Sequence, residues 1–330
     1  MRQDESQKDL LELLQAIRNG TLDRKKHWPL LASRNYANLP EEEKKLFQKD
    51  CLKICATNKA CKAYNVQKLK EMKVPVAVID SVNEPASGKG LSTNKAGGLP
   101  NDTLLAEGGK VMLHSNLWTE GGLTNGSKGI ISRILYKNNR KPPQVPDAVL
   151  CHFPDYKGPA FDFDSEGRKL IPIVAKSVEF FHYNIKHVRT TIPLSPCDAI
   201  SCHKCQGQTC TSHTLMDLGG REFCLGLFYV ALSRVKELNR MAFDPMPDWM
   251  RVSSFTKRAE FKERLNEEEK LDKLFKETLQ RYRDSRKDDK NVDHQEAQED
   301  QIDLEVLEGL EGLFSQDDND NVLWNADEFD

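Results

Sequence analysis

The chain has 330 residues, enough for one or two cores, with 38% hydrophobic and 30% charged residues and a formal net charge of −3. No apolar run approaches the roughly 20 residues that a membrane span needs, and the N-terminus has no apolar signal core, so the sequence favours neither a membrane protein nor a secreted one. The odd number of cysteines, nine, is most simply explained by a reducing intracellular compartment.

The charge is distributed unevenly along the chain. Residues 288–330 carry 16 acidic side chains and one basic one, whereas the preceding 287 residues carry 47 basic and 35 acidic side chains. A basic body with an acidic tail is typical of proteins that handle nucleic acids. Composition alone, however, favours a solvated tail without a partner.

The first 80 residues contain helical patterns followed by a strand, a helix and a strand. The predicted elements are, in order, a helix over 1–20, a polar helix over 40–49, a buried strand over 51–56, a helix over 57–72 and a strand over 74–79. Gly20 and Thr57 supply a C-terminal stop and an N-cap. The strand–helix–strand pattern predicts a β-α-β unit and therefore a parallel sheet.

A loop rich in Gly, Ser and Lys is predicted over 84–109. It contains Ser87-Gly88-Lys89-Gly90, which invites comparison with a phosphate-binding loop. A Walker sequence requires Gly five residues before its Gly-Lys pair and Ser or Thr after the Lys, and Asn83 and Gly90 occupy those places. The sequence therefore does not predict a phosphate loop here.

Short apolar segments separated by Pro and Gly fill the middle of the chain. A strand is predicted over 110–117 and a tight turn at Asn125-Gly126. Further β segments are predicted over 130–135, 148–153, 170–175, 178–181 and 187–194, with loops at 142–143 and 162–167. This spacing predicts a small antiparallel barrel.

In the last third of the chain both helices and strands are predicted. The pattern predicts a helix ending at Gly207, a strand over 214–218 and a helix that carries Arg234, followed by a strand over 240–243. A charged helix with an apolar stripe is predicted over 255–286.

The composition beyond Asp288 predicts disorder. Only residues 302–314 have apolar side chains at helical spacing there, and we expect this segment to fold on binding a protein partner.

Two motifs carry the strongest functional signal. Cys202–Thr209 resembles the pattern Ile-His-Lys-Ser-Gln-Gly-x-Thr, and Gly226–Arg234 resembles Gly-Gln-x-Tyr-Val-Ala-Leu-Ser-Arg. Both patterns lie near the C-terminus of superfamily 1 DNA helicases of the Pif family, relatives of RecD. Cys202, Cys205 and Leu227 depart from the family's Ile, Ser and Gln. Because both motifs match in register, about twenty residues apart, the resemblance to this family is strong.

Weaker matches extend the resemblance over roughly residues 1–245. Arg2-Gln3 is similar to an Arg-Gln pair that follows the family's first motor domain. Asn65 resembles an Asn in the helix after a strand ending in Thr-Asn, and the segment 108–117 resembles Gly-Ala-x-Val-Met-Leu-x-x-Asn-Leu.

The resemblance implies an α/β fold, in which a RecA-like parallel-sheet domain contains an inserted small Src-homology-3-like β-barrel. The implied division of the chain is a first part of the second RecA-like domain over 1–124, the barrel over 125–190, a second part with both motifs over 191–250, a charged helix over 251–287 and an acidic disordered tail over 288–330.

The resemblance also implies roles for individual residues. Arg234 and, more weakly, Arg2 would stabilise charge on the γ-phosphoryl group, and Gln206 and Gly207 would lie at the nucleotide phosphates. The residues that would contact single-stranded DNA are Asn116, Trp118, Asn125, Lys128, His203, Lys204 and Thr209. The alternatives are a surface salt bridge for Arg234, a terminal charge for Arg2 and a core position for Trp118.

The sequence lacks the other half of such a motor. It has no Gly-x-x-x-x-Gly-Lys-Ser/Thr and no apolar strand ending in paired acids. We therefore expect ATP and Mg²⁺ to act only in a complete motor, whose first RecA-like domain comes from upstream sequence or a partner chain, and we expect the isolated chain to be inactive.

The expected function is the C-terminal motor half of an ATP-dependent 5′-to-3′ DNA helicase, nuclear, with the family's roles in repair, recombination and telomere maintenance. The alternative is a catalytically inactive nucleic-acid-binding or interaction protein derived from a truncated helicase gene.

A zinc site is the competing interpretation of the first motif. Six potential ligands crowd into seventeen residues, namely Cys197, Cys202, His203, Cys205, Cys210 and His213. Cys210-x-x-His213 follows Cys202-x-x-Cys205 too closely for the usual finger, and the helicase motif already explains the surrounding residues. No metal site is therefore predicted.

Overall fold

The computed structural model describes residue 3 and residues 5–221 and 224–288. The described chain forms two compact units. We call Lys45–Lys204 with Ser212–Asp217 the sheet unit, and Met1–Lys44, Cys205–Thr211 and Leu218–Asp330 the helical unit. The boundary passes through the first helicase-like motif, between Lys204 and Cys205.

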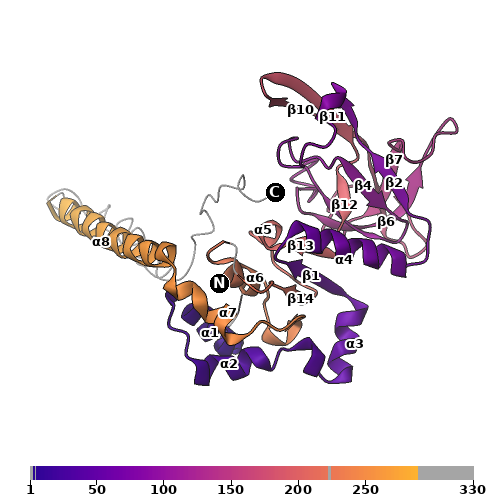
Figure 1. Ribbon diagram of the computed structural model, residues 1–330. Helices are drawn as coiled ribbons and strands as arrows, with labels where there is room; N and C mark the ends of the chain where they lie inside the picture. Colours follow the sequence, from indigo (N-terminus) through magenta and orange to yellow (C-terminus); the bar gives the residue numbers. More distant parts are fainter. Residues whose placement is uncertain (1–2, 4, 222–223, 289–330) are drawn as a thin grey trace, which may run out of the picture. The chain divides into compact units, whose positions relative to one another are not determined.

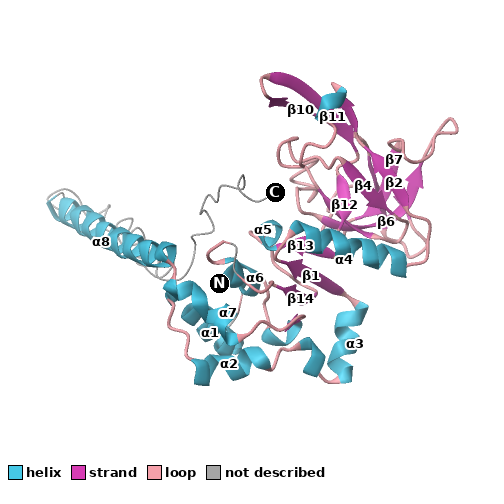
Figure 2. Ribbon diagram, viewed as in Figure 1, coloured by secondary structure: helices cyan, strands magenta, loops and turns pink. Residues whose placement is uncertain are grey.

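A parallel sheet with one helix beside it opens the sheet unit. Strand β1 (Cys51–Cys55) pairs in parallel with both β13 (Ala199–Ser201) and β14 (His213–Asp217), with Ile54 opposite Ile200 and Met216. Helix α4 (Asn58–Glu71) follows β1 in the chain (Figure 2). Its N-cap Thr57 accepts a hydrogen bond from the Ala60 N–H. The predicted parallel sheet is confirmed.

The predicted β-α-β unit is wrong. Strand β2 (Ala77–Asp80), which follows α4, pairs antiparallel with β4 (Asp102–Leu105) in a separate two-stranded sheet. The parallel partners of β1 instead come from residues more than 140 positions later in the chain. Local periodicity identifies a strand but not the strand with which it pairs, so the sequence pattern could not show that β1 and β2 belong to different sheets.

The predicted loop over 84–109 is partly structured. It contains β4 and a 3-10 turn, η3 (Ala86–Gly88), and it begins at the end of strand β3 (Val82–Glu84). These pieces are three or four residues long, too short for an alternating pattern to stand out among Gly and Ser.

Two antiparallel sheets form the rest of the sheet unit. One has the order β12-β5-β6-β7-β9-β8, and the other the order β10-β11-β3. Their remaining strands are β5 (Lys110–Leu113), β6 (Lys128–Leu135), β7 (Ala148–His152), β8 (Asp162–Phe163), β9 (Lys169–Ile173), β10 (Lys176–His182), β11 (Ile185–Thr191) and β12 (Leu194–Pro196). The short strand β8 occupies part of a predicted loop. The mixed α/β class, with parallel and antiparallel sheets, is confirmed.

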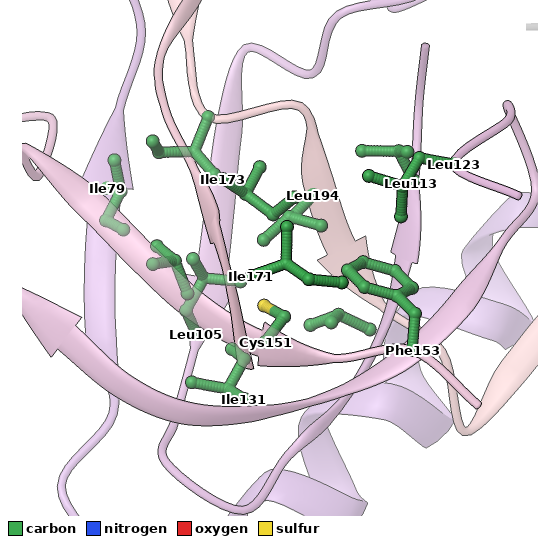
Figure 3. Close-up of a cluster of buried hydrophobic side chains, with 13 residues drawn as sticks. Ile79, Leu105, Leu113, Leu123, Ile131, Cys151, Phe153, Ile171, Ile173 and Leu194 are labelled. Atoms are coloured by element: carbon green, nitrogen blue, oxygen red, sulfur yellow. The ribbon is translucent and has the colours of Figure 1, made fainter. Parts of the chain in front are cut away.

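The core cluster of the sheet unit is built from alternate residues of strands in the six-stranded sheet and from the β2–β4 pair. Ile79, Leu105, Val149 and Ile173 are fully buried, and Figure 3 shows Ile131, Cys151 and Ile171 among the side chains that fill the space between them. Pairing of β12 with β5 sets Leu194 opposite Leu113. In this antiparallel register Ser195 lies opposite Met112, so it is diagonal to His114, which is two residues after Met112 and on the same face.

The helical unit gathers segments from both ends of the chain. Its first elements are η1 (Glu5–Gln7), α1 (Lys8–Asn19), α2 (Arg24–Ala32), η2 (Tyr36–Asn38) and α3 (Glu41–Lys49), which continues into the sheet unit. Its later elements are α6 (Leu227–Ser233), η4 (Leu238–Arg240), β15 (Met241–Phe243), α7 (Trp249–Ser253), η5 (Ser254–Lys257) and α8 (Ala259–Asp288). The predicted helix stop at Gly20 is confirmed, since Gly20 caps α1 with φ +70°.

Helix α1 packs against α6, and the rings of Phe228 and Phe243 stack 6.1 Å apart. The orange α8 in Figure 1 is the longest helix of the described chain. Among the described residues, none of the helices has the length and apolar character to cross a membrane.

Candidate functional site

Arg234 lies in the helical unit at the end of α6. Its side chain is buried, with 2% of its surface exposed. The guanidinium donates from Nε to the Val230 carbonyl (3.0 Å) and from Nη2 to the Ser233 hydroxyl (2.8 Å). The guanidinium is therefore held by its own helix in the interior and does not lie on the surface.

Gln3 contacts the backbone on both sides of Arg234. Its Nε2 donates to the carbonyl of Ser233 (3.3 Å) and to that of Val235 (2.6 Å), and the residue is 9% exposed. The sequence reasoning singled out Arg2, which lies outside the described residues, and missed Gln3. The position of Gln3 in the Arg-Gln pair was the sequence feature that could have identified it.

The end of the first motif is hydrogen-bonded to the backbone of the segment that carries Arg234. After the short helix α5 (Cys202–Cys205), Gly207 adopts a left-handed conformation with φ +75°, and the Gln208 N–H donates to the Cys205 carbonyl. The Cys210 N–H then donates to the Arg234 carbonyl at 2.9 Å, within a parallel bridge from Cys210 to Val235. The turn with Gln206, Gly207 and Thr209 is thereby joined to the segment that carries Arg234.

Asn116, Trp118 and Asn125 form one loop system in the sheet unit. The Asn116 Oδ1 accepts from the Asn125 N–H at 2.8 Å, and Trp118 exchanges backbone hydrogen bonds with Leu123. The Trp118 ring contacts Tyr156 edge-on at 6.0 Å and remains 42% exposed. Trp118 is therefore not a core residue.

Basic side chains approach Cys197 from several elements of the sheet unit. Burial raises the pKa of the Cys197 thiol to about 11, while the charges of Lys128, Lys110 and Lys204 act in the opposite direction. Partial desolvation of the Lys204 ammonium lowers its pKa, although the residue, like His203 beside it, is exposed. The charges of Lys128 and Lys204, 76 positions apart in sequence, thus act on the pKa of the same thiol.

Asn65 of α4 fixes the chain just before the first motif. Its amide nitrogen donates to the carbonyls of Pro196 (3.2 Å) and Ala199 (3.0 Å), and its Oδ1 accepts from the Ala199 N–H (2.7 Å). These bonds hold β13, from which α5 with His203 and Lys204 follows directly.

His114 is a titratable group that the sequence reasoning missed. Its Nε2 lies 2.6 Å from the Ser195 hydroxyl. Burial, followed by the charge of Lys204, lowers the pKa of His114 from 6.5 to about 4, against an opposing hydrogen bond to the Gly98 carbonyl. The neutral ring satisfies both contacts when Nδ1–H donates to Gly98 and Nε2 accepts from Ser195.

We expect the stability of the sheet unit to depend on His114 between pH 7 and pH 5. A depressed folded pKa leaves the stabilisation complete above about pH 6.5 and removes it as the pH falls toward 4, because the unfolded chain takes up the proton first. Wild type should lose about 1–2 kcal/mol more than His114→Gln over this interval in urea unfolding. Parallel pH curves for the two proteins would contradict the assignment.

Within the described part of the chain, no group of three or more His, Cys, Asp or Glu side chains could hold a metal ion. The cysteines of the first motif are buried, as are Cys55 and Cys61. Cys61 shares its thiol hydrogen with Cys55, which raises the pKa of Cys61 and lowers that of Cys55. These thiols pack in the interior as small apolar groups.

Comparison with solved structures identifies the fold. A Pif1 helicase from Candida albicans matches 78% of this chain and 58% of its own, with a TM-score of 0.57 and 21% identity. A structure concerning the unwinding of forked double-stranded DNA by two coordinating Pif1 helicases matches 74% of this chain and 48% of its own (TM-score 0.52, 21% identity). A Bacteroides Pif1 in complex with ADP-AlF3 and single-stranded DNA matches 74% and 50% (TM-score 0.50, 20% identity).

No protein-family model matches the chain, and no curated protein does. The chain spans about half the length of the helicase structures that it matches. Over roughly three-quarters of its own length it has the fold of the Pif1 helicase structures that it matches.

Proposed function

We propose that this chain supplies the second motor domain of an ATP-dependent DNA helicase of the Pif type, with Arg234 acting on the nucleotide. The observation that carries the proposal is the contact, within the helical unit, between the end of the first motif and the segment that carries Arg234. The Cys210 N–H donates to the Arg234 carbonyl, so the Gln206-Gly207 turn and Arg234 are held by one backbone bridge.

The residues at this bridge suit a nucleotide phosphate. A guanidinium, a side-chain amide and a left-handed Gly turn with an exposed backbone all bind anions well. When bound to Mg²⁺ in a complete motor, ATP supplies the energy of its hydrolysis. Arg234 would stabilise the charge that develops on the transferred group, Gln206 and Gly207 would bind phosphate oxygens, and Gln3 would hold the Arg234 segment in place.

The described residues offer no acidic cluster suited to Mg²⁺. We therefore assign the metal ligands and the phosphate loop to a first RecA-like domain, supplied by upstream sequence or by a partner chain. The 5′-to-3′ polarity, the nuclear location and the roles in repair, recombination and telomere maintenance remain proposals that follow from the family resemblance alone.

Single-stranded DNA is the proposed ligand of the sheet unit. The charges of Lys128 and Lys204 act on the pKa of the same thiol, and these side chains would neutralise phosphates. Trp118 is 42% exposed and would stack on a base. Asn116 and Asn125 fix the loop that carries the ring. His203 would extend the contact in the sheet unit, and the role of Thr209, in the helical unit, follows from the family resemblance alone. The solved Bacteroides relative was captured with single-stranded DNA, which supports this assignment.

We expect Trp118→Ala to weaken the binding of oligo-dT by about 5- to 100-fold, because base stacking on an aromatic is worth about 1–3 kcal/mol. Fluorescence anisotropy at fixed salt measures the loss. Phe163→Ala is the matched control, since Phe163 is also an exposed aromatic of the sheet unit, at 58%. Equal losses in both variants would count against a specific stacking site.

The catalytically inactive binding protein remains the alternative function. It shares the DNA-binding prediction, so the anisotropy experiment does not separate the two. They differ in whether Arg234 acts on a nucleotide in the native assembly.

A further inference from the structure

Arg189 of β11 is a fully buried cation that the proposed site does not use. Burial alone lowers the pKa of its guanidinium, and no carboxylate of the described residues opposes that shift. The guanidinium donates instead to four neutral oxygens at 2.8–3.1 Å, namely Oδ1 of Asn83 and the carbonyls of Gly88, Leu91 and Leu99. Burying a charge without an opposite charge is costly. The described contacts give this cation one task, which is to hold the segment over residues 83–99.

The segment that Arg189 holds is the glycine-rich loop that does not match a Walker sequence. Gly97 has φ +61°, and a Cβ at that position would lie 2.3 Å from Val178 of β10, so the loop passes too close to β10 for a side chain. Fixing a glycine backbone costs more conformational entropy than fixing any other residue. The loop contains four glycines, Gly88, Gly90, Gly97 and Gly98. Its bonds to Arg189 therefore order a backbone that would otherwise be free.

The end of this loop is bonded to the segment that leads into the candidate DNA contacts. The Gly98 carbonyl accepts a hydrogen bond from His114, which lies two residues before Asn116. Asn116 in turn accepts from the Asn125 N–H at 2.8 Å, in the loop system that carries Trp118. Both loops belong to the sheet unit. The glycine-rich loop therefore adjoins the proposed contacts to single-stranded DNA.

The charge of the loop suits an anion. Residues 85–101 contain two lysines, Lys89 and Lys95, and no acidic side chain. Lys89 is paired with Asp80 at 3.4 Å. Lys95 is exposed, and the described residues offer it no ion pair. The ammonium of Lys95 is therefore the charge of this loop that a phosphate can use.

Lys95 lies on a closed turn of the backbone. The Ala96 N–H donates to the Ser92 carbonyl (3.1 Å), and the Gly98 N–H donates to the Thr93 carbonyl (2.9 Å). A backbone that is already ordered loses less entropy when a ligand binds to it, which increases affinity. This feature distinguishes Lys95 from a lysine on an unsupported loop.

We propose that the loop over residues 84–99 is a further phosphate contact for single-stranded DNA, in which Lys95 binds the DNA backbone and Arg189 positions the loop. This inference rests on the proposed function, because it adds an electrostatic contact to the stacking on Trp118. Phosphates are the expected ligand rather than bases, since residues 84–99 contain no aromatic side chain. Arg189 is a positioning residue: it acts through the loop and does not touch the ligand.

Lys95→Ala tests the contact itself. Each phosphate contact to a single strand contributes about 0.7 to the slope of log K against log salt concentration. Lys95→Ala should therefore lower the slope for oligo-dT by about 0.7 and weaken binding about five-fold at 0.1 M salt. Lys89→Ala is the matched control, because Lys89 lies on the same loop but its charge is already paired. It should leave both values within error of wild type.

Arg189→Lys tests the positioning. An ammonium cannot bond to four oxygens in the fixed geometry of a guanidinium, so amides of residues 86–98 should exchange faster, and the salt slope should fall as in Lys95→Ala. The variant with both substitutions should bind no more weakly than Lys95→Ala, because each change removes the same contact. A purely structural role for Arg189 would leave the slope unchanged and add its loss to that of Lys95→Ala. If Arg189→Lys does not fold, Lys95→Ala decides alone, since Lys95 is exposed.

Trp118→Ala, measured beside these variants, keeps two kinds of failure apart. If Trp118→Ala weakens binding while Lys95→Ala matches wild type, the loop contact is overturned and the DNA role of the sheet unit stands. Equal losses in Lys95→Ala and Lys89→Ala would also overturn the loop contact, because they would report a general charge effect. Absence of oligo-dT binding in the wild type would overturn both the DNA role and the loop contact.

Discussion

Replacing Asn65 with leucine is expected to lower the free energy of unfolding by about 3 kcal/mol. The side chain makes three hydrogen bonds to the Pro196 and Ala199 backbone, and it is 9% exposed. Leucine has nearly the same size but leaves two carbonyls and one N–H buried without a partner. Each such group lowers the free energy of unfolding by about 1–3 kcal/mol when water cannot reach it. The midpoint of urea unfolding measures the loss.

The control for this experiment is Gln67→Leu on the same helix. Gln67 is exposed and bonds only to the Glu71 carboxylate, so its replacement should change stability by no more than about 0.5 kcal/mol. A small effect of Asn65→Leu, matching the control, would mean that water or backbone movement satisfies Ala199. The assignment of Asn65 as the residue that positions β13 would then fail.

Asn65 also links stability to the candidate DNA contacts. Ala199 begins β13, and α5 with His203 and Lys204 starts immediately after that strand. Because the helix is only four residues long and starts directly after β13, the position of that strand fixes where it begins. A loosened β13 should therefore also weaken DNA binding through Lys204.

The features that the sequence predicted well are those with a local physical cause. Thr57 caps α4 through its own side chain, and Gly20 ends α1 because only glycine takes its left-handed conformation without strain. Two motif strings were enough to imply the fold, which the structural comparison then identified.

The features that the sequence missed depend on distant partners. The β-α-β prediction failed because β1 pairs with β13 and β14, whereas β2 pairs with β4. The depressed pKa of His114 arises from its burial near Ser195, 81 positions away, and no pattern around either residue signals that pairing. The sequence could likewise not decide between an exposed and a core position for Trp118, because a tryptophan in a turn-rich segment is compatible with both.

Replacing Arg234 with lysine is expected to lower the ATP turnover of the native assembly by about 10³-fold. The guanidinium donates through Nε and Nη2 in a fixed fork to Val230 and Ser233, and a lysine has a single ammonium group that cannot keep this geometry while reaching a phosphate. The measurement is steady-state ATP hydrolysis, stimulated by single-stranded DNA, by the purified complex or longer product that contains a Walker phosphate loop.

Arg240→Lys is the matched control, because Arg240 belongs to the same unit but has a partly exposed side chain bonded to the Thr211 carbonyl and paired with Glu237. It should keep nearly full turnover. Oligo-dT affinity should be unchanged in both variants, which separates a catalytic loss from misfolding around a buried site. Unchanged turnover in Arg234→Lys would remove the arginine from the reaction. A native product without ATP hydrolysis before any substitution would favour the inactive binding protein, because a phosphate-stabilising arginine acts only where a phosphate loop presents the nucleotide to it.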